Sequence, residues 1–339
     1  MQRQKSLVIL SQAFGTNFSG GTSATHFVFE RLQECFEDVI FIGKEVGNHS
    51  FKNFQFRRYK NIWHALKIIR EIKNEKEAIY YGDFYMTYFF ILAGVPYYFT
   101  YHDNWPEQAD QSFGDRIKGL FYIPIYKWII KKSLMTFAVS KFRLKFIGKY
   151  TKHLKLIRNG IVMSGAELDG DKVKPKSRLL MTGNLDNRKY RWAIAVFRQL
   201  ANLKQNPPRI DIFGKAVDAK VLQALSQFDF VHYKGFQNEI PLSEYGALLC
   251  TSQMENLSIS VVEALKAHLP VIAFDVGGLS EVIDGTNGRL IAPGDIHAFT
   301  NAVIGLSKES FSFGDEDLAE FDWDVAAGKY KEVIIDGNE

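Results

Sequence analysis

Short apolar runs alternate with longer segments of helical periodicity along the whole chain. SLVILS (6–11) precedes a helical segment at 23–36, and DVIFIG (38–43) precedes NIWHALKIIREIK (61–73), whose apolar residues fall on one helical face. The next strand-like runs are AIYYGD (78–83), PYYFTYHD (96–103) and MTFAVS (135–140). Strands that alternate with helices predict βαβ units with right-handed crossovers, and therefore a parallel sheet.

A polar segment rich in glycine and lysine, residues 158–177, interrupts this alternation and predicts an interdomain linker. A second series of strand-plus-turn units follows it: RLLMTGNL, RIDIFGK, FVHYKGF, GALLCTS, LPVIAFD and GRLIAPGD. The length of 339 residues also exceeds that of one typical domain. We therefore predict an α/β fold of two Rossmann-like, doubly wound parallel-sheet domains, 1–160 and 161–320, with residues 321–339 as a final helical segment.

Composition excludes several classes of protein. A chain with 46% hydrophobic and 24% charged residues is expected to be globular, and not disordered or fibrous. Its most apolar stretch, LFYIPIYKWIIKK (120–132), is broken by Pro124 and three lysines, so no membrane-spanning helix is expected. The N-terminal run SLVILS predicts a first strand and not a signal peptide. Cys35 and Cys250 lack metal or disulfide spacing, which favours a reducing, cytoplasmic location.

Charge is distributed unevenly between the two halves. Residues 1–160 contain 24 Lys and Arg against 13 Asp and Glu, a net charge of +11, whereas residues 161–339 carry −7. A basic half favours an anionic partner, although a solvated basic surface is an equal alternative. FKNFQFRRYK (51–60) and LFYIPIYKWIIKK (120–132) combine aromatic and basic residues and suit the inner face of a membrane. The alternative for the second segment is a crossover helix whose rings mostly pack inward. No RRM, KH or helix-turn-helix signature is present, so no nucleic-acid partner is expected.

The glycines behind the first strand do not match a dinucleotide fingerprint. Gly15, Gly20 and Gly21 lack the GxGxxG spacing, which disfavours a nicotinamide enzyme. Gly20 and Gly21 are expected to form a loop that leads into Thr22 and Ser23, two good N-cap residues. Free backbone N–H groups there could bind an anion, and a tight turn before a capped helix is an equal alternative.

The segment MENLSISVVEALK carries two carboxylates, Glu255 and Glu263, around a mostly apolar stretch. It lies between a predicted strand and a predicted helix, so it predicts a turn at the carboxyl end of a parallel strand, where open α/β sheets bind ligands. Helix-start N–H groups near Ser258 and Ile259 would meet a phosphate there. Glu255 would line the same crevice, and Glu263 could accept hydrogen bonds from a diol such as ribose. Two alternatives are a capping box made by Ser260 and Glu263, and a loop in which Glu255 points into water.

These residues carry a resemblance to a known family. ENLSISVVEAL is similar to the E-x7-E signature of retaining glycosyltransferases of the GT4 family, and PVIAFDVGGLSEVIDGTNGRLIAPGD resembles the family's continuation. Six further motifs occur in the family's order: YHD, AVSKF, RNG, GNLDNRK, VHYKGF and FDWDVAAGKY. The resemblance covers most of the chain and implies the GT-B fold, in which two Rossmann-like domains face each other across a cleft.

The resemblance implies a role for each matching residue around the donor. Glu263 would bind the ribose hydroxyls of a nucleotide sugar, and Glu255 would contact sugar hydroxyls near the reacting carbon. The backbone of Asn256, Leu257, Ser258 and Ile259 would hold the distal phosphate.

GNLDNRK (183–189) resembles a family motif that neutralises the diphosphate with an arginine and a lysine. Gly183 and Lys189 match this motif, but Asn184 occupies the arginine position, and the adjacent Arg188 is a candidate to compensate. The alternative for these cations is a solvated basic turn.

Three further residues are implied by resembling motifs. His102 matches the family histidine that reaches the transferred sugar from the N-terminal domain, which would make it catalytic, whereas a histidine satisfied by structural hydrogen bonds is the alternative. Gly235 and Phe236 would lie beside the nucleobase. The final helix, with its apolar stripe of Trp323, Ala326, Ala327 and Tyr330, would pack back on the N-terminal domain.

The implied reaction is transfer of a hexosyl group with retention of configuration. Lys189, Arg188 and the helix-start amides would stabilise the departing diphosphate, so neither a metal nor another cofactor is expected. The triplets at 169–171 and 315–317 resemble a metal-binding DxD but are interpreted as solvated charge. The preferred donor is a UDP-sugar, with GDP-mannose second. The expected acceptor is a saccharide or a polyprenyl-linked saccharide, as in bacterial surface polysaccharide synthesis, and the protein would lie peripherally on the inner membrane face. Alternatives are a GT-B-fold nucleotide-sugar epimerase and a non-catalytic partner of an active glycosyltransferase.

Overall fold

The computed structural model describes residues 5–16, 18, 20–161, 177–203, 206–237, 239–314 and 318–338. Its contacts divide the chain into two compact units, Met1–Gly160 with Glu320–Glu339, and Ile161–Ala319. Most of the predicted linker, residues 162–176, lies outside the described residues. Residue Arg158, at the start of the predicted linker, is buried and makes an ion pair with Glu320, so this end of the linker is packed against the first unit.

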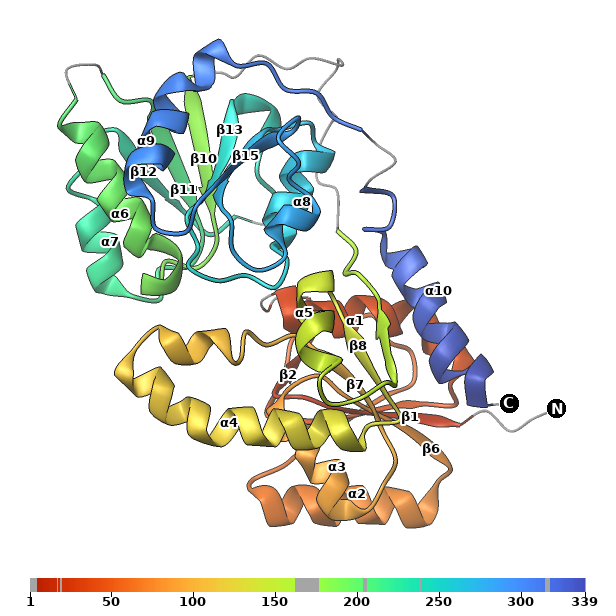
Figure 1. Cartoon of the computed structure of the whole chain (residues 1–339). Coiled ribbons are helices and arrows are strands. Elements are labelled where there is room, and N and C mark those ends of the chain that lie inside the picture. The colour runs from red at the N-terminus through yellow and green to blue at the C-terminus, as the bar shows by residue number, and fades with distance from the viewer. Residues whose placement is uncertain are drawn as a thin grey trace. The chain divides into compact units, whose positions relative to one another are not determined.

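The first unit is built on a seven-stranded sheet with the order β5-β3-β1-β6-β7-β8-β9 (Figure 1). All its strand pairs are parallel. The chain winds outward from β1 in one direction and then from β6 in the other, which places a topological switch point between these two strands. The strands are β1 (Ser6–Leu10), β3 (Val39–Gly43), β5 (Phe54–Arg58), β6 (Ala78–Gly82), β7 (Tyr98–Tyr101), β8 (Met135–Ala138) and β9 (Leu154–Leu156); β2 (Ala13–Phe14) and β4 (Glu45–Val46) pair separately.

Helices cover both faces of this sheet, so its central strands are apolar throughout and not alternating. Successive residues of β1 point to opposite faces: Val8 and Leu10 join one core cluster, and Leu7 and Ile9 join the other. The helices of this unit are α1 (Gly20–Leu32), α2 (Ile62–Glu75), α3 (Tyr88–Ala93), α4 (Phe113–Lys132), α5 (Lys141–Ile147) and α10 (Trp323–Ile334). Side chains of α2, α3, α4 and α5 fill the first cluster, and those of α1 and α10 fill the second.

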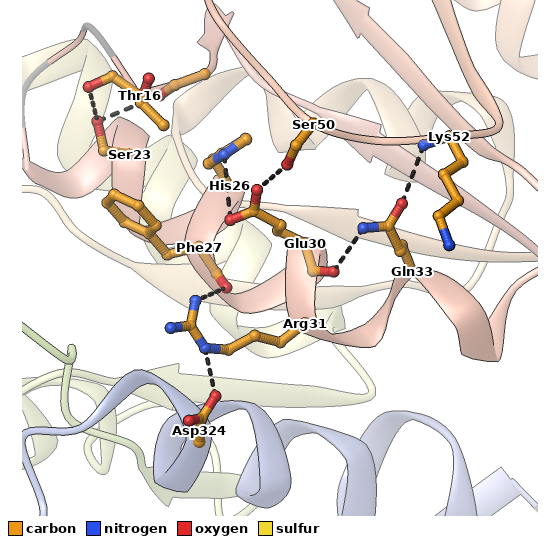
Figure 2. Close-up of polar contacts among 11 residues, drawn as sticks. Thr16, Ser23, His26, Phe27, Glu30, Arg31, Gln33, Ser50, Lys52 and Asp324 are labelled. Atoms are coloured by element: carbon orange, nitrogen blue, oxygen red, sulfur yellow. Dashed lines mark hydrogen bonds and ion pairs between the residues drawn. The ribbon is translucent and has the colours of Figure 1, made fainter. Parts of the chain in front are cut away.

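Helix α10, from the end of the chain, packs beside α1 in the first unit (Figure 1). Its buried side chains are Trp323, Ala326, Ala327, Tyr330 and Ile334. The Trp323 ring lies 5.1 Å from that of Phe27, and the Tyr330 hydroxyl lies 2.8 Å from Thr100 Oγ1. Arg31 of α1 also donates to Asp324 of α10, as Figure 2 shows. The last helix therefore completes the core of the first unit.

The second unit contains a six-stranded parallel sheet with the order β12-β11-β10-β13-β14-β15, and its switch point lies between β10 and β13. Its strands are β10 (Arg178–Thr182), β11 (Arg209–Phe213), β12 (Val231–Gly235), β13 (Ala247–Cys250), β14 (Val271–Phe274) and β15 (Gly288–Ile291). Its helices are α6 (Asn187–Ala201), α7 (Ala219–Leu225), α8 (Ile259–Lys266) and α9 (Ile296–Gly305). The prediction of two doubly wound parallel-sheet domains is confirmed.

Short 3-10 helices connect several of these elements: η1 (Gln33–Cys35), η2 (Tyr85–Thr87), η3 (Glu107–Asp110), η4 (Leu242–Glu244), η5 (Leu279–Glu281), η6 (Leu306–Lys308) and η8 (Asp336–Asn338).

The aromatic segment 51–60 is an edge strand and not only a surface patch. Its centre forms β5, which pairs with β3 at one edge of the sheet. Phe51 and Tyr59, at its two ends, are buried in the two opposite core clusters. This segment was not predicted as a strand, and its rings serve mainly to fix the edge of the sheet.

Candidate functional site

The turn between β13 and α8 has the geometry expected from the sequence. β13 ends at Cys250, and α8 begins at Ile259 with Ser258 in the N-cap position. Ser260 lies inside the helix, so the alternative of a capping box with Ser260 as the cap is wrong. The Ser258 hydroxyl makes no capping bond and lies 3.1 Å from that of Ser260. The start of α8, at the carboxyl edge of the sheet, is therefore left without a side-chain cap in the described structure.

Neighbouring segments hold this turn in place. Gly278 N–H donates to the Asn256 carbonyl at 2.9 Å. Gly277 has a φ of +63°, and a Cβ on it would lie 1.6 Å from the Glu255 carbonyl oxygen, so that only glycine fits there. From the other side, Arg188 Nη1 donates to the Met254 carbonyl at 3.1 Å. These contacts fix the position of Glu255 from two directions.

Two cations converge on the Glu255 carboxylate. Its Oε1 atom lies 3.4 Å from Lys189 Nζ and 3.7 Å from Arg188 Nη1. Burial raises the pKa of this carboxyl, but Lys189, Arg188 and a hydrogen bond from Ser252 outweigh that effect, so the pKa lies below its usual value. Glu255 is therefore ionised at neutral pH beside two positive charges, in a site where a bound phosphate would find the same cations.

The start of α6 supplies both cations. Asp186 caps this helix by accepting a hydrogen bond from Lys189 N–H at 2.9 Å. Gly183 has a φ of +117°, and a Cβ there would lie 2.8 Å from Lys189 Nζ, so the glycine makes room for the lysine side chain. Asn184 is exposed. Thr251 Oγ1 donates to the Lys189 carbonyl at 2.7 Å, which ties α6 to the end of β13.

Glu263 and the end of β12 provide further groups in the second unit. Glu263 lies in the second turn of α8, is partly exposed, and has its pKa raised by burial to about 7. Gly235 ends β12 with a φ of +75°, and the Phe236 ring behind it is 58% exposed. Lys215 Nζ lies 5.1 Å from the centroid of that ring. An exposed ring beside a cation suits stacking with a planar ligand.

In the first unit, the predicted glycine loop is part of a helix. Gly20 and Gly21 are the first two residues of α1, and Thr22 and Ser23 are buried inside it, so the prediction that they cap the helix is wrong. Ser23 Oγ instead donates to the carbonyls of the preceding loop, as Figure 2 shows for Thr16. Gly21 packs closely on His102, because a Cβ at position 21 would lie 3.2 Å from His102 Cβ.

His102 follows β7 at the carboxyl edge of the first sheet, beside the start of α1. Burial lowers the pKa of its imidazole to about 4, so the ring is neutral at pH 7. Its centroid lies 6.2 Å from that of Phe84. A neutral ring can donate one hydrogen bond and accept another, which suits a sugar hydroxyl.

Two acids at the same edge of the sheet were not singled out from the sequence. Asp83 follows β6, is buried, and accepts a hydrogen bond from Thr25 Oγ1 of α1 at 2.8 Å. Asp103 directly follows His102. Burial raises the pKa of each carboxyl to about 7. Each acid ends a predicted strand motif, AIYYGD or PYYFTYHD, and that position at the carboxyl edge was the signal that could have identified them.

Metal-ligating side chains do not cluster in the described residues. In the described part of the chain, no three His, Cys, Asp or Glu side chains are grouped so as to hold a metal ion. The DxD-like triplets at 169–171 and 315–317 lie outside the described residues.

Sequence comparison places a known family on the second unit. Residues 176–309 match the family described as Glycosyl transferases group 1. A phosphatidyl-myo-inositol mannosyltransferase of Mycobacterium leprae is 30% identical over 96 residues, 25% of this chain and 26% of that protein. A poly(glycerol-phosphate) alpha-glucosyltransferase of Bacillus subtilis is 32% identical over 110 residues, 30% of this chain and 16% of that protein. The matched segments thus span only about a quarter or less of these curated relatives.

Solved structures are similar over nearly the whole chain. Sucrose-phosphate synthase from Thermosynechococcus elongatus has a TM-score of 0.72 at 17% identity and covers 97% of this chain and 98% of its own. HepE of Anabaena, in complex with UDP-glucose, has a TM-score of 0.67 at 13% identity and covers 97% and 95%. The chain has the GT-B fold of these glycosyltransferases, and its residues 176–309 match the group 1 glycosyl transferases.

Proposed function

We propose that this chain is a retaining glycosyltransferase of the GT4 type, which moves a hexosyl group from a nucleotide sugar to a saccharide or lipid-linked saccharide. The observation that carries the proposal is the convergence of Lys189 and Arg188 on Glu255, beside the uncapped start of α8. The group 1 match over residues 176–309 and the glycosyltransferase names of both curated relatives support it.

The donor site is proposed to contact each part of a nucleoside diphosphate sugar in turn. The nucleobase would stack on Phe236 beside Gly235, and the ribose hydroxyls would bind the Glu263 carboxyl. The diphosphate would lie between the α8 amides, in the segment from Asn256 through Leu257 to Ile259, and the two cations. We favour uridine as the base because HepE was crystallised with UDP-glucose, with GDP-mannose as the second candidate.

Arg188 is proposed to take the role of the arginine that the family motif has at the position of Asn184. It occupies the first turn of α6 next to Lys189, and its guanidinium is held at the site by the Met254 carbonyl and by Glu255. A fixed guanidinium can bind two phosphate oxygens at once. Asn184 is also the feature that favours a non-catalytic partner of another transferase, and the activity of Arg188 variants separates the two ideas.

The proposed chemistry uses charge that is already in place. As the bond between sugar and phosphate breaks, negative charge grows on the leaving diphosphate, and Lys189, Arg188 and the helix start stabilise it without reorganisation. The leaving phosphate would take the acceptor proton on the same face of the sugar, which retains the anomeric configuration without a metal. Glu255 would position sugar hydroxyls, and neutral His102 would hydrogen-bond to the transferred sugar.

The acceptor and the location are proposed from the character of the first unit. Its net charge of +11 over residues 1–160 favours an anionic, lipid-linked saccharide at the cytoplasmic face of a membrane, as in bacterial surface polysaccharide synthesis. None of the helices in the described ranges has both the length and the apolar composition needed to span a bilayer.

A panel of nucleotides and nucleotide sugars tests the proposal by thermal shift, with and without a chelator. We expect the matching donor to raise the melting temperature by several degrees, since a ligand at 100 times its Kd adds about 2.7 kcal/mol of stability, and we expect the chelator to change nothing. Glu255→Ala and Glu263→Ala should each weaken this shift. The proposal fails if no nucleotide sugar shifts the wild type, or if a bound donor is epimerised in the absence of any acceptor.

A further inference from the structure

Helix α4 is apolar on two opposite faces. Its inward face carries Tyr126, Ile129 and Ile130, which are buried in the core of the first unit. Its outward face is also apolar, and its large side chains are exposed in the following fractions: Phe113 79%, Ile117 45%, Leu120 71%, Phe121 67% and Trp128 39%. These positions recur at spacings of three, four and seven, so they form one stripe along the helix. The inward-packing alternative for this segment thus describes only one of its two faces.

Cations border this exposed stripe on both sides. At about 100° per residue, Arg116 and Lys127 fall along one edge of the stripe, and Lys118 and Lys132 fall along the other. Lys131 lies in line with the stripe at its C-terminal end. The acidic residue of α4, Asp115, is already occupied by Ser112 at 2.6 Å and by Lys118 at 3.5 Å. The outward surface of α4 is therefore a strip of aromatic and aliphatic side chains with cations along both edges. Of these, Lys118 is paired with Asp115, and Lys127 lies 5.4 Å from the centroid of the Tyr150 ring.

We propose that this face of α4 docks the protein on a bilayer surface that contains anionic phospholipid. A helix lying in the plane of such a surface inserts its apolar side about 5–10 Å, while lysine and arginine at its edges reach the phosphate groups. Exposed Phe113, Leu120 and Phe121 would enter the acyl region, and Trp128 would lie at the interface, where indole rings are favoured.

The cations along α4 favour binding to an anionic bilayer over packing against a second copy of the chain. Symmetric packing of two α4 faces would bring the cationic edges of one copy against those of the other, and like charges in contact oppose association. An anionic lipid surface instead pairs with the same cations. Docking through α4 deepens the membrane location proposed above and rests on it, although the observations on α4 do not depend on the donor site.

Vesicle sedimentation tests the proposal with purified full-length protein and no nucleotide sugar. The vesicles are phosphatidylcholine alone, or phosphatidylcholine with 30% phosphatidylglycerol. Leu120→Glu is compared with Val217→Glu, a control in the second unit whose side chain is 59% exposed and whose charge change is identical. We expect the wild type and Val217→Glu to bind the anionic vesicles, and Leu120→Glu to lose at least about 10-fold in partitioning.

A second pair of variants tests the charges separately. Lys131→Gln with Lys132→Gln should weaken binding to anionic vesicles several-fold, whereas Lys220→Gln with Lys308→Gln, which are also exposed lysines, should not. The proposal is overturned if Leu120→Glu binds like the wild type, or if anionic lipid makes no difference. It is equally overturned if Leu120→Glu converts a dimer into a monomer while the wild type ignores vesicles, because the occupant is then a second copy. Since the assay contains no donor, loss of vesicle binding and loss of donor binding are separate results.

Discussion

Glu263→Gln should stabilise the protein at alkaline pH, although it removes a proposed donor contact. Burial raises the pKa of Glu263 from 4.5 in the unfolded state to about 7 in the folded state. Between these two pH values the folded state keeps a proton that the unfolded state has already released. Stability is therefore lost as the pH rises through this window, and the full cost is present above pH 7. At about 1.4 kcal/mol for each pH unit between the two values, it amounts to about 3.5 kcal/mol. Glutamine does not titrate, so its stabilising effect should grow by about 2–3 kcal/mol between pH 5 and pH 8.

The other glutamate of the pair supplies a matched control with the opposite sign. The pKa of Glu255 lies below its usual value because Lys189 and Arg188 outweigh burial, so its ionisation stabilises the folded state above its unfolded pKa. Glu255→Gln should thus be less stable than the wild type by about the same amount at pH 5 and at pH 8, because both values lie above the unfolded pKa of 4.5. Urea unfolding of both variants and the wild type at the two pH values, followed by far-UV circular dichroism, measures both effects. If Glu255→Gln is as stable as the wild type at both pH values, or if Glu263→Gln shows no pH dependence, our reading of the two environments is wrong.

Three further changes test other parts of the site and fold. Arg188→Ala should lower the rate of sugar transfer by about 100-fold, whereas Arg198→Ala, on the same helix but exposed, should leave initial rates unchanged. Gly277→Ala should lower the free energy of unfolding by about 2 kcal/mol or more and weaken donor binding, because the new Cβ would meet the Glu255 carbonyl. Gly285 shares the positive φ but has open space around it, so Gly285→Ala should lower the free energy of unfolding less. Urea unfolding measures both. Asp322→Ala removes the acceptor for the N–H groups of Asp324 and Val325 at the start of α10 and should lower the free energy of unfolding by about 1 kcal/mol, also read by urea.

The strands of both sheets were predictable because helices cover both faces of each sheet. A strand buried on both sides is a continuous apolar run with turn residues behind it, and that pattern is visible without any knowledge of its partners. The edge strands β5 and β9 were not predicted, since each is partly exposed and polar residues interrupt its pattern. The edge strands β12 and β15 of the second sheet were predicted, because glycine-containing turns follow or begin their motifs FVHYKGF and GRLIAPGD. Local signals thus identified the covered strands and two of the four edges.

Helix starts were predicted less well than the elements themselves. Thr22 and Ser23 are good N-cap residues, but α1 begins before them at Gly20. The start of α8 near Ser258 and Ile259 was predicted, and only the alternative cap at Ser260 was wrong. The outward stripe of α4 was equally hidden, because a helix that is apolar on two faces has no periodicity that shows which face meets solvent.

The composition of the donor site was suggested by the sequence, but its internal contacts were not. The motif order pointed to Lys189, Glu255 and Glu263, whereas the placement of Arg188 against the Met254 carbonyl joins positions 66 residues apart. Such a contact depends on how α6 and the β13–α8 turn pack at the switch point, and no local pattern records it.

Equilibrium titration of UDP and a UDP-sugar into the wild type, Glu263→Ala and Glu281→Ala, followed by calorimetry, tests most directly the claim that the start of α8 holds a nucleotide sugar. We predict saturable binding to the wild type and to Glu281→Ala, and at least about a 10-fold weaker affinity for Glu263→Ala, the loss of one charge-assisted contact. Equal affinity for all three proteins, or no nucleotide binding to the wild type, would contradict the account.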